Sequence, residues 1–197
     1  FLLAQIAFGL GMNLLSMAIG KAAMDKPKVD VQFDVDFGDD TPLTFIAGDY
    51  ATAGKLKYIG SWGKNTRWIT EVIEISALPI TGLQNVWFND EIGDIRWSSP
   101  RTENGQVMGY PVKNFSEGVG TGDERDRCWI KLVDGTQTAA DPFLVATFGS
   151  DADYPWTSAM VGRGKAYAIL TYYYDPEVMT SAPSKLFQPQ PLPMYDP

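Results

Sequence analysis

The clearest pattern in this chain is a strict alternation of apolar and polar side chains about thirty residues from its first position. The apolar positions are Val29, Val31, Phe33, Val35 and Phe37, and they alternate with Asp30, Gln32, Asp34 and Asp36. A period of two predicts a half-buried β-strand. We therefore expect the apolar set to face a core and the acidic set to face water or a lumen.

Short apolar runs separated by Gly, Asn, Asp or Pro occupy much of the remaining chain and predict further strands. These strands are expected at residues 43–47, 55–59, 68–76, 85–88, 95–97, 129–132 and 166–174. One short helix is predicted at residues 141–147, with Asp141 as its N-cap and Pro142 in its first position. The predicted fold class is mainly β, a barrel or a sandwich, with one N-terminal apolar α-helix.

The N-terminal helix is predicted because residues 1–20 carry no charge, and the first charged residue is Lys21. An apolar run of about 20 residues is long enough to cross a bilayer as a helix. Gln5 and Asn13 interrupt this run, which favours a helix buried among other protein chains over a transmembrane helix. A signal peptide is disfavoured because no basic segment precedes the apolar run.

These patterns divide the chain into three parts. Residues 1–24 form the apolar helix, and residues 28–182 form a β-rich region. An insertion near 101–127, rich in Gly, Asn, Glu and Asp, predicts a long loop that carries short strands. Residues 183–197 contain five prolines and predict an extended linker to a further domain.

Composition narrows the classes of function. The net charge is −8, from 16 Lys and Arg against 24 Asp and Glu, which disfavours specific nucleic-acid binding. The chain has no histidine, so it lacks the commonest general base and the commonest neutral metal ligand. Its one cysteine, Cys128, is interpreted as a small buried apolar residue beside Trp129.

Acidic residues offer the main candidates for chemistry. Asp34, Asp36, Asp39 and Asp40 resemble a calcium loop, but the terminal bidentate glutamate is missing, and a solvated strand face is favoured. The pairs Asp90-Glu91 and Asp123-Glu124 have the residue types of a glycosidase, yet adjacent acids beside glycine are common in turns. We expect no enzyme, and we assign no catalytic, cofactor-binding or metal-binding residue.

Aromatic residues make up 13% of the chain, and exposed aromatic rings can stack on sugars. A carbohydrate-binding β module is therefore an open alternative, although aromatics also favour strands and fill β cores. In the run Tyr172-Tyr173-Tyr174, alternate rings point to opposite faces of a strand. We expect another subunit or domain to cover at least one of these faces.

Several short motifs follow one another between residue 54 and residue 197. They are Gly54-Lys55-Leu56-Lys57-Tyr58-Ile59-Gly60, Val86-Trp87-Phe88-Asn89-Asp90-Glu91, Asp134-Gly135-Thr136-Gln137-Thr138-Ala139-Ala140-Asp141-Pro142, Trp156-Thr157-Ser158-Ala159, Gly162-Arg163-Gly164-Lys165-Ala166-Tyr167, Tyr174-Asp175-Pro176 and Met194-Tyr195-Asp196-Pro197. In this order they resemble the central tail-tip, or host-specificity, proteins of long-tailed phages. The resemblance covers roughly residues 50–197.

The resemblance implies a structural protein of the virion and no active site in this part of the chain. It implies a homotrimeric hub at the tail tip, whose β domains continue the tail tube and close it, connected to the parts that recognise the host. The implied partners are two further copies of the chain, other tail-tip and tail-tube proteins and the tape-measure protein. Residues 1–20 could also meet the host membrane at infection. A carbohydrate-binding module and a membrane-anchored β domain remain the alternative functions.

Overall fold

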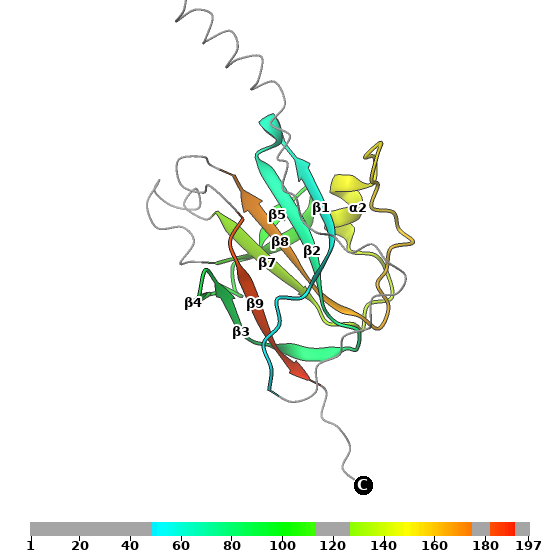
Figure 1. Ribbon diagram of the computed structural model, residues 1–197. Helices are drawn as coiled ribbons and strands as arrows, with labels where there is room; N and C mark the ends of the chain where they lie inside the picture. The colour runs from blue at the N-terminus through cyan, green and yellow to red at the C-terminus, as the bar shows by residue number, and fades with distance from the viewer. Residues whose placement is uncertain (1–48, 113–126, 175–181, 192–197) are drawn as a thin grey trace, which may run out of the picture. The chain divides into compact units, whose positions relative to one another are not determined.

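The computed structural model describes residues 49–112, 127–174 and 182–191, all within the unit formed by residues 37–197 (Figure 1). The predicted helix at residues 1–24, the alternating strand at 29–37 and the strand at 43–47 lie outside these residues. The elements are β1 (Lys55–Trp62), the 3-10 turn η1 (Lys64–Thr66), β2 (Trp68–Ser76), β3 (Ile80–Phe88), β4 (Glu91–Ile92), β5 (Arg101–Glu103), β6 (Gln106–Pro111), β7 (Cys128–Val133), α2 (Pro142–Phe148), β8 (Ala166–Tyr173) and β9 (Lys185–Pro191). The described part of the chain is mainly β, as the sequence predicts.

Two antiparallel sheets form the framework. The larger has six strands in the order β1-β2-β8-β7-β6-β5, and the smaller has three in the order β4-β3-β9. Period-two patterns place β2 at the residues predicted for it, whereas β1 and β3 are longer than predicted. The run at 95–97 was predicted as a strand, but it makes only an isolated bridge between Ile95 and Val112.

The core of the molecule lies between the two sheets. Alternate residues of β2, β7 and β8 point toward the smaller sheet, which contributes Val86 and Phe88 from β3 and Phe187 from β9. All of these side chains are buried, and sheets that pack face to face in this way form a β-sandwich. The expectation of a barrel or a sandwich is therefore met by a sandwich.

The opposite face of the larger sheet is covered by α2 and the loop that follows it. Phe143, Leu144 and Phe148 of α2 pack with Trp129 and Ile169 of the sheet in a second buried cluster. The central strands β2 and β8 are consequently buried on both faces. The helix begins where the sequence predicts, with Asp141 as N-cap and proline in its first turn.

The tyrosine run has different surroundings on its two faces. Tyr172 is buried in the core between the sheets, and Tyr173 packs edge-on against Trp68 on the other face. Tyr173 and Tyr174 are half-buried, so the expected cover of one face by another subunit or domain stays a prediction.

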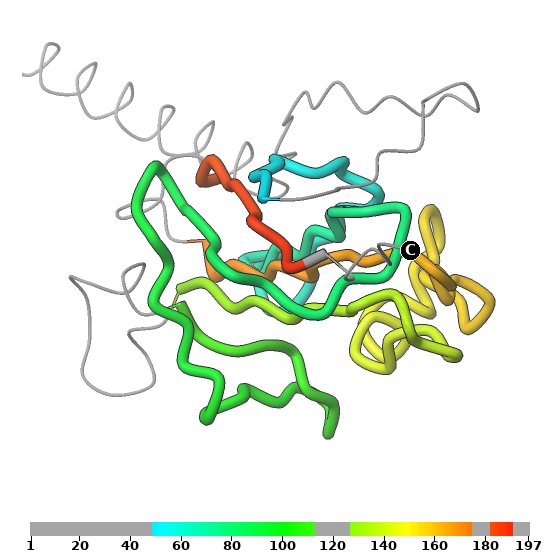
Figure 2. The backbone as a smooth tube through the Cα atoms, turned by 90° about the horizontal axis from the view of Figure 1, so that it is seen from below, coloured from blue at the N-terminus to red at the C-terminus, as the bar shows by residue number. Residues whose placement is uncertain are grey.

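The structure also corrects the expected linker at residues 183–197. Residues Lys185–Pro191 are not a linker but strand β9, which pairs with β3 over its whole length (Figures 1 and 2). Phe187 exchanges both backbone hydrogen bonds with Thr52 on the side away from β3. Since strand residues alternate, Pro189 and Pro191 also turn their nitrogens away from β3. The ladder between β9 and β3 therefore loses no hydrogen bond at these prolines.

The short strands predicted within the segment near 101–127 are present in its first half. Strands β5 and β6 form a hairpin that extends the larger sheet, so residues 101–111 belong to the framework. The remainder of this segment, residues 113–126, lies outside the described residues.

Candidate functional site

The motif residues of the C-terminal third meet around the side chain of Gln137. Its Nε2 lies 3.3 Å from the carbonyl oxygen of Val161 and 3.1 Å from that of Lys165, and it also bonds to the carbonyl of Gly162. Its Oε1 accepts a hydrogen bond from the backbone of Gly135 at 2.9 Å. We call this arrangement the Gln137 clasp. It fixes the loop after β7 to the loop that leads into β8.

The turn at Asp134 positions Gly135, whose backbone N–H donates to Gln137 in the clasp. Asp134 Oδ1 accepts hydrogen bonds from the backbone N–H of Thr136 at 2.9 Å and from its hydroxyl at 2.7 Å, and these bonds lower the pKa of the Asp134 carboxyl. Gly135 has a φ of 100°, and a Cβ there would lie 2.7 Å from Cα of Pro79. Both the backbone conformation and the close approach therefore require glycine.

The motif at residues 134–142 ends at the N-cap of α2, which is Asp141. Asp141 Oδ1 accepts from the backbone N–H groups of Phe143 at 3.0 Å and Leu144 at 3.1 Å, while its other oxygen pairs with Lys131 of β7. One carboxylate thus caps the helix and ties it to the sheet. A Cβ at Gly60 of β1 would lie 2.5 Å from the ring of Phe148, so this motif glycine allows β1 and α2 to approach. These motif residues act in packing and turn formation.

An aromatic cluster packs at the end of the larger sheet where β1 turns into β2. Trp62 and Trp68 are stacked, with ring centroids 5.1 Å apart and an interplanar angle of 19°. The guanidinium of Arg101 lies 4.7 Å from the Trp68 ring centroid and 5.0 Å from that of Trp129. Trp62 and Arg101 together occupy the ring of Trp68, which leaves no free face there for a sugar.

The outer face of the smaller sheet has a different character. Because Val86, Phe88 and Phe187 point inward, their neighbours along the strands point outward. Trp87 pairs with Ile92 of β4 on one side and with Leu186 of β9 on the other. Ile92 is 57% exposed and Leu186 39% exposed, so an apolar row crosses the three strands.

Amide side chains continue this face along β3 and β9. Asn85 Nδ2 donates to Gln188 Oε1 at 2.8 Å, and Gln188 Nε2 donates to Asp49 Oδ1 at 3.0 Å. Gln84 and Gln190 are exposed on the same strands. We use the name β3–β9 outer face for the outward residues Thr81, Gln84, Asn85, Trp87, Ile92, Leu186, Gln188 and Gln190.

A buried ion pair connects the two sheets. Glu71 of β2 bonds to Lys185 of β9, and their side chains are 1% and 14% exposed. Tyr172 and Cys128 lie beside this pair. Burial raises the pKa of the Cys128 thiol well above its usual range, with Lys185 opposing and Glu71 adding to the shift, and burial likewise raises the pKa of Tyr172.

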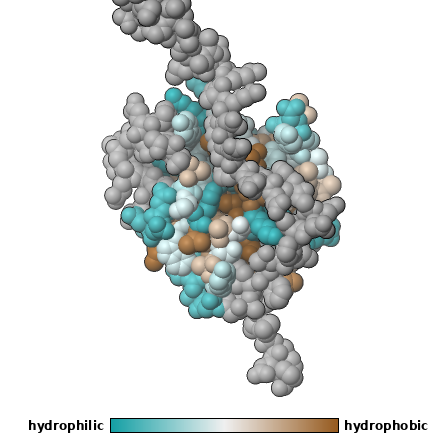
Figure 3. Space-filling model, in the orientation of Figure 1, coloured by the Kyte–Doolittle hydropathy of each residue, from teal (hydrophilic) through white to brown (hydrophobic). Residues whose placement is uncertain are grey.

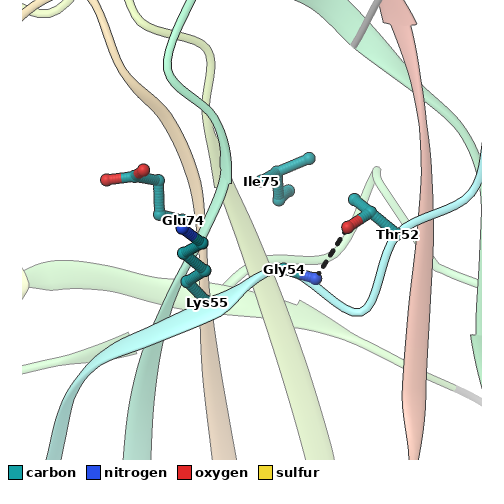
Figure 4. Close-up of a pocket in the computed structure, with 5 residues that line it drawn as sticks. All are labelled: Thr52, Gly54, Lys55, Glu74 and Ile75. Carbon is teal, nitrogen blue, oxygen red and sulfur yellow. Dashed lines mark hydrogen bonds between the residues drawn. The ribbon is translucent and has the colours of Figure 1, made fainter. Parts of the chain in front are cut away.

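A small pocket lies where the chain enters β1 (Figure 4). Its lining residues are Thr52, Gly54, Lys55, Glu74 and Ile75, and its volume is about 90 Å³. The Glu74 carboxylate bonds instead to Lys165 at 3.2 Å, outside the pocket lining. Ligand sites usually measure about 300–1,000 Å³, so this space suits a few water molecules.

The acidic residues singled out in the sequence have these positions. Asp90 lies in the tight turn between β3 and β4 with a φ of 67°, and Glu91 begins β4; both are exposed. Asp34, Asp36, Asp39, Asp40, Asp123 and Glu124 lie outside the described residues. Within residues 49–112, 127–174 and 182–191, no group of three Asp, Glu, Cys or His side chains gathers closely enough to hold a metal ion.

Of the aromatic residues considered in the sequence, most are packed. Trp129 and Trp156 are buried, and Cys128 is fully buried beside Trp129. Trp97 is the exception, 49% exposed with its ring 5.2 Å from that of Tyr110.

The sequence placed Trp87 in one of the short motifs but did not show Asn85, Gln188 and Gln190 as its neighbours. The signal was present in Leu186, Phe187, Gln188, Pro189 and Gln190, which alternate between outward and inward positions. The two prolines of β9 favoured a linker and concealed this alternation.

Comparisons with known proteins assign no family to this chain. No family model matches it, and no curated protein matches it either. In the part of the chain that the structure describes, no helix has the length and apolar character needed to cross a membrane.

Proposed function

We propose that this chain is a structural component of a phage tail tip, where it forms the central hub that closes the tail tube and connects to the host-recognition parts. In this proposal it acts as a homotrimer beside other tail-tip and tail-tube proteins and the tape-measure protein. It serves as a structural part of the virion and not as a catalyst.

The observation that carries the proposal is the Gln137 clasp. The motifs that resemble the tail-tip family are separated by more than twenty residues, yet Gly135, Gln137, Gly162 and Lys165 bond to one another. Motifs that matched by chance would be expected to scatter over the fold. Their convergence on one packing unit supports a shared structural role.

The described surface has the mixed composition usual for a protein surface. Apolar and hydrophilic side chains are intermingled on the coloured part of the face seen in Figure 3. The two-sided burial of β2 and β8 gives a rigid framework for contacts with other proteins.

The test is to locate the protein in virions of the phage that encodes it. Purified virions are analysed by mass spectrometry and by electron microscopy with a gold-labelled antibody raised against this chain. The proposal predicts its peptides in the virion and label confined to the tail tip. Label along the tail shaft, on the head, or only in host debris would contradict it.

A further inference from the structure

The β3–β9 outer face carries no ionised side chain, although 20% of the residues in the chain are charged. Its outward residues are the eight named above: Trp87, Ile92 and Leu186, four amides and one threonine. The carboxylate of Asp49 contacts this face at its rim, where it accepts a hydrogen bond from Gln188. A ligand that fits this face is therefore uncharged.

Two of the four amides on this face, Asn85 and Gln188, are held in fixed orientations. The bonds from Asn85 to Gln188 and from Gln188 to Asp49 form a relay that orients both side chains. In the same sheet, Thr81 donates its hydroxyl hydrogen to the backbone carbonyl of Gln190 at 3.1 Å. An amide has both donor and acceptor atoms, so fixed amides suit partners whose groups also donate and accept. Hydroxyl groups have this property.

The apolar row lies next to these amides. Trp87 occupies the middle strand, and Asn85 stands two positions before it on the same face. A tryptophan ring presents a broad apolar surface that is already ordered, so little entropy is lost when a flat partner stacks on it. Sugar rings present an apolar C–H face and a rim of hydroxyl groups. The face therefore offers what one sugar ring requires: a stacking surface with amides beside it.

We propose that the β3–β9 outer face binds a neutral polysaccharide, with Trp87 stacking on a sugar ring and Asn85, Gln188 and Gln190 bonding to hydroxyl groups. This site is distinct from the Gln137 clasp and does not depend on a position in the tail tip.

A second copy of the chain fits this face less well. A stable protein interface uses about 20–30 residues from each partner and a well-packed apolar centre, whereas the apolar row here has three side chains. Addition of a strand at β9 is opposed by Pro189 and Pro191, which present no N–H at the open edge.

The experiment uses the full chain of 197 residues with maltohexaose, cellohexaose and chitohexaose as neutral probes and hexagalacturonate as a charged comparison. Binding is measured by isothermal titration calorimetry and by NMR shifts of the Asn85 and Gln188 side-chain amides. We expect at least one neutral hexasaccharide to bind and to shift these amides, and hexagalacturonate to bind more weakly. Trp87→Ala should weaken the affinity by about tenfold or more, equivalent to about 1.4 kcal/mol.

Trp97→Ala is the matched control, because Trp97 is an exposed tryptophan outside the face, whereas Trp87 is half-buried within it. It should leave the affinity unchanged, and thermal unfolding confirms that both variants fold. Absence of binding by all three neutral probes, or equal loss in both variants, overturns the proposal. A change of oligomeric state in Trp87→Ala without saccharide binding by the wild type identifies the face as a protein interface and also overturns it.

Discussion

At the scale of single residues, much of the local structure depends on a few polar side chains held among backbone groups. Gln137 is half-buried, and its one amide serves one backbone N–H and three carbonyl groups of two loops. The carbonyl of Gly162 also accepts from the backbone N–H of Lys165, so it keeps one partner if the amide is lost. For the other three groups, loss of the amide removes a bond within the protein, which costs more than the bonds contribute on average.

We therefore predict that Gln137→Ala lowers the free energy of unfolding by about 2–3 kcal/mol. Gln84→Ala, at an exposed position of β3, should change it by less than about 0.5 kcal/mol. Urea unfolding followed by tryptophan fluorescence measures both. Equal and small effects would show that water replaces the amide without loss.

The Glu71–Lys185 pair leads to a second prediction. Removal of one member leaves the other as a buried charge, so Lys185→Met should destabilise the protein by about 3–5 kcal/mol. The double variant Glu71→Leu/Lys185→Met should recover most of this loss, because no buried charge remains. A double-mutant cycle by urea denaturation gives the coupling. If the changes in the free energy of unfolding from the two single substitutions add up to that of the double variant, the Glu71 and Lys185 side chains do not interact in solution.

A third prediction concerns Cys128, which is completely buried and whose thiol pKa is raised by burial. Only the thiolate reacts quickly with disulfide reagents. The native protein should therefore fail to react with Ellman's reagent at pH 8 over minutes, and should release one equivalent of chromophore once it is unfolded in guanidinium. Fast reaction of the native protein would show that the core between the sheets opens readily.

At the scale of elements, β9 shows best what the sequence could and could not predict. Strands β2, β7 and β8 follow from runs of β-branched and aromatic residues, and α2 follows from Asp141 and Pro142. In β9 the prolines suggested an unpaired segment. Only the tertiary arrangement shows that their nitrogens face away from β3, on the side where Phe187 bonds to Thr52.

The remaining errors have the same origin in long-range contacts. Burial of Thr70, Glu71 and Glu74 in β2 cannot be read from the strand itself, because it requires a layer on each face of the sheet. Residues 95–97 have the composition of a strand, but their β-pairing is limited to an isolated bridge between Ile95 and Val112. The β3–β9 outer face joins residues about one hundred positions apart, and no local pattern brings Asn85 next to Gln188.

The fourth prediction tests β9 as part of the core. Phe187 is fully buried between the sheets, so Phe187→Ala should lower the free energy of unfolding by about 3–5 kcal/mol. Its neighbour Leu186 points outward and is 39% exposed, so Leu186→Ala should cost about 1 kcal/mol or less. Thermal and urea unfolding compare the two. A small effect at Phe187 would restore the interpretation of this segment as a linker.

At the scale of the whole molecule, the described residues form three layers: the smaller sheet, the larger sheet and α2 with its loop. The chain covers both sides of its central strands without help from a second copy. Any trimer must therefore be held by other surfaces. The uncharged segment at residues 1–20 is the candidate that the sequence offers, since an apolar segment of that length requires cover in water.

The fifth prediction follows from this. The full chain should form a trimer in light scattering, and Leu15→Asp should abolish it, because three like charges would meet near one axis. Leu78→Asp is the control, since Leu78 is 53% exposed and lies outside the segment. A monomeric wild type would contradict the hub proposal at this point.

The way β9 is anchored also determines how the molecule responds to mechanical force. A force applied at Pro191 along the axis of β9 would be perpendicular to the hydrogen bonds between β9 and β3. It would load these bonds together and would not open them one at a time. At the other end of the same strand, Lys185 forms an ion pair with Glu71 of the larger sheet, and Phe187 is buried between the two sheets. Tension applied on that side would thus be shared by both sheets, and the sandwich would transmit it as one body.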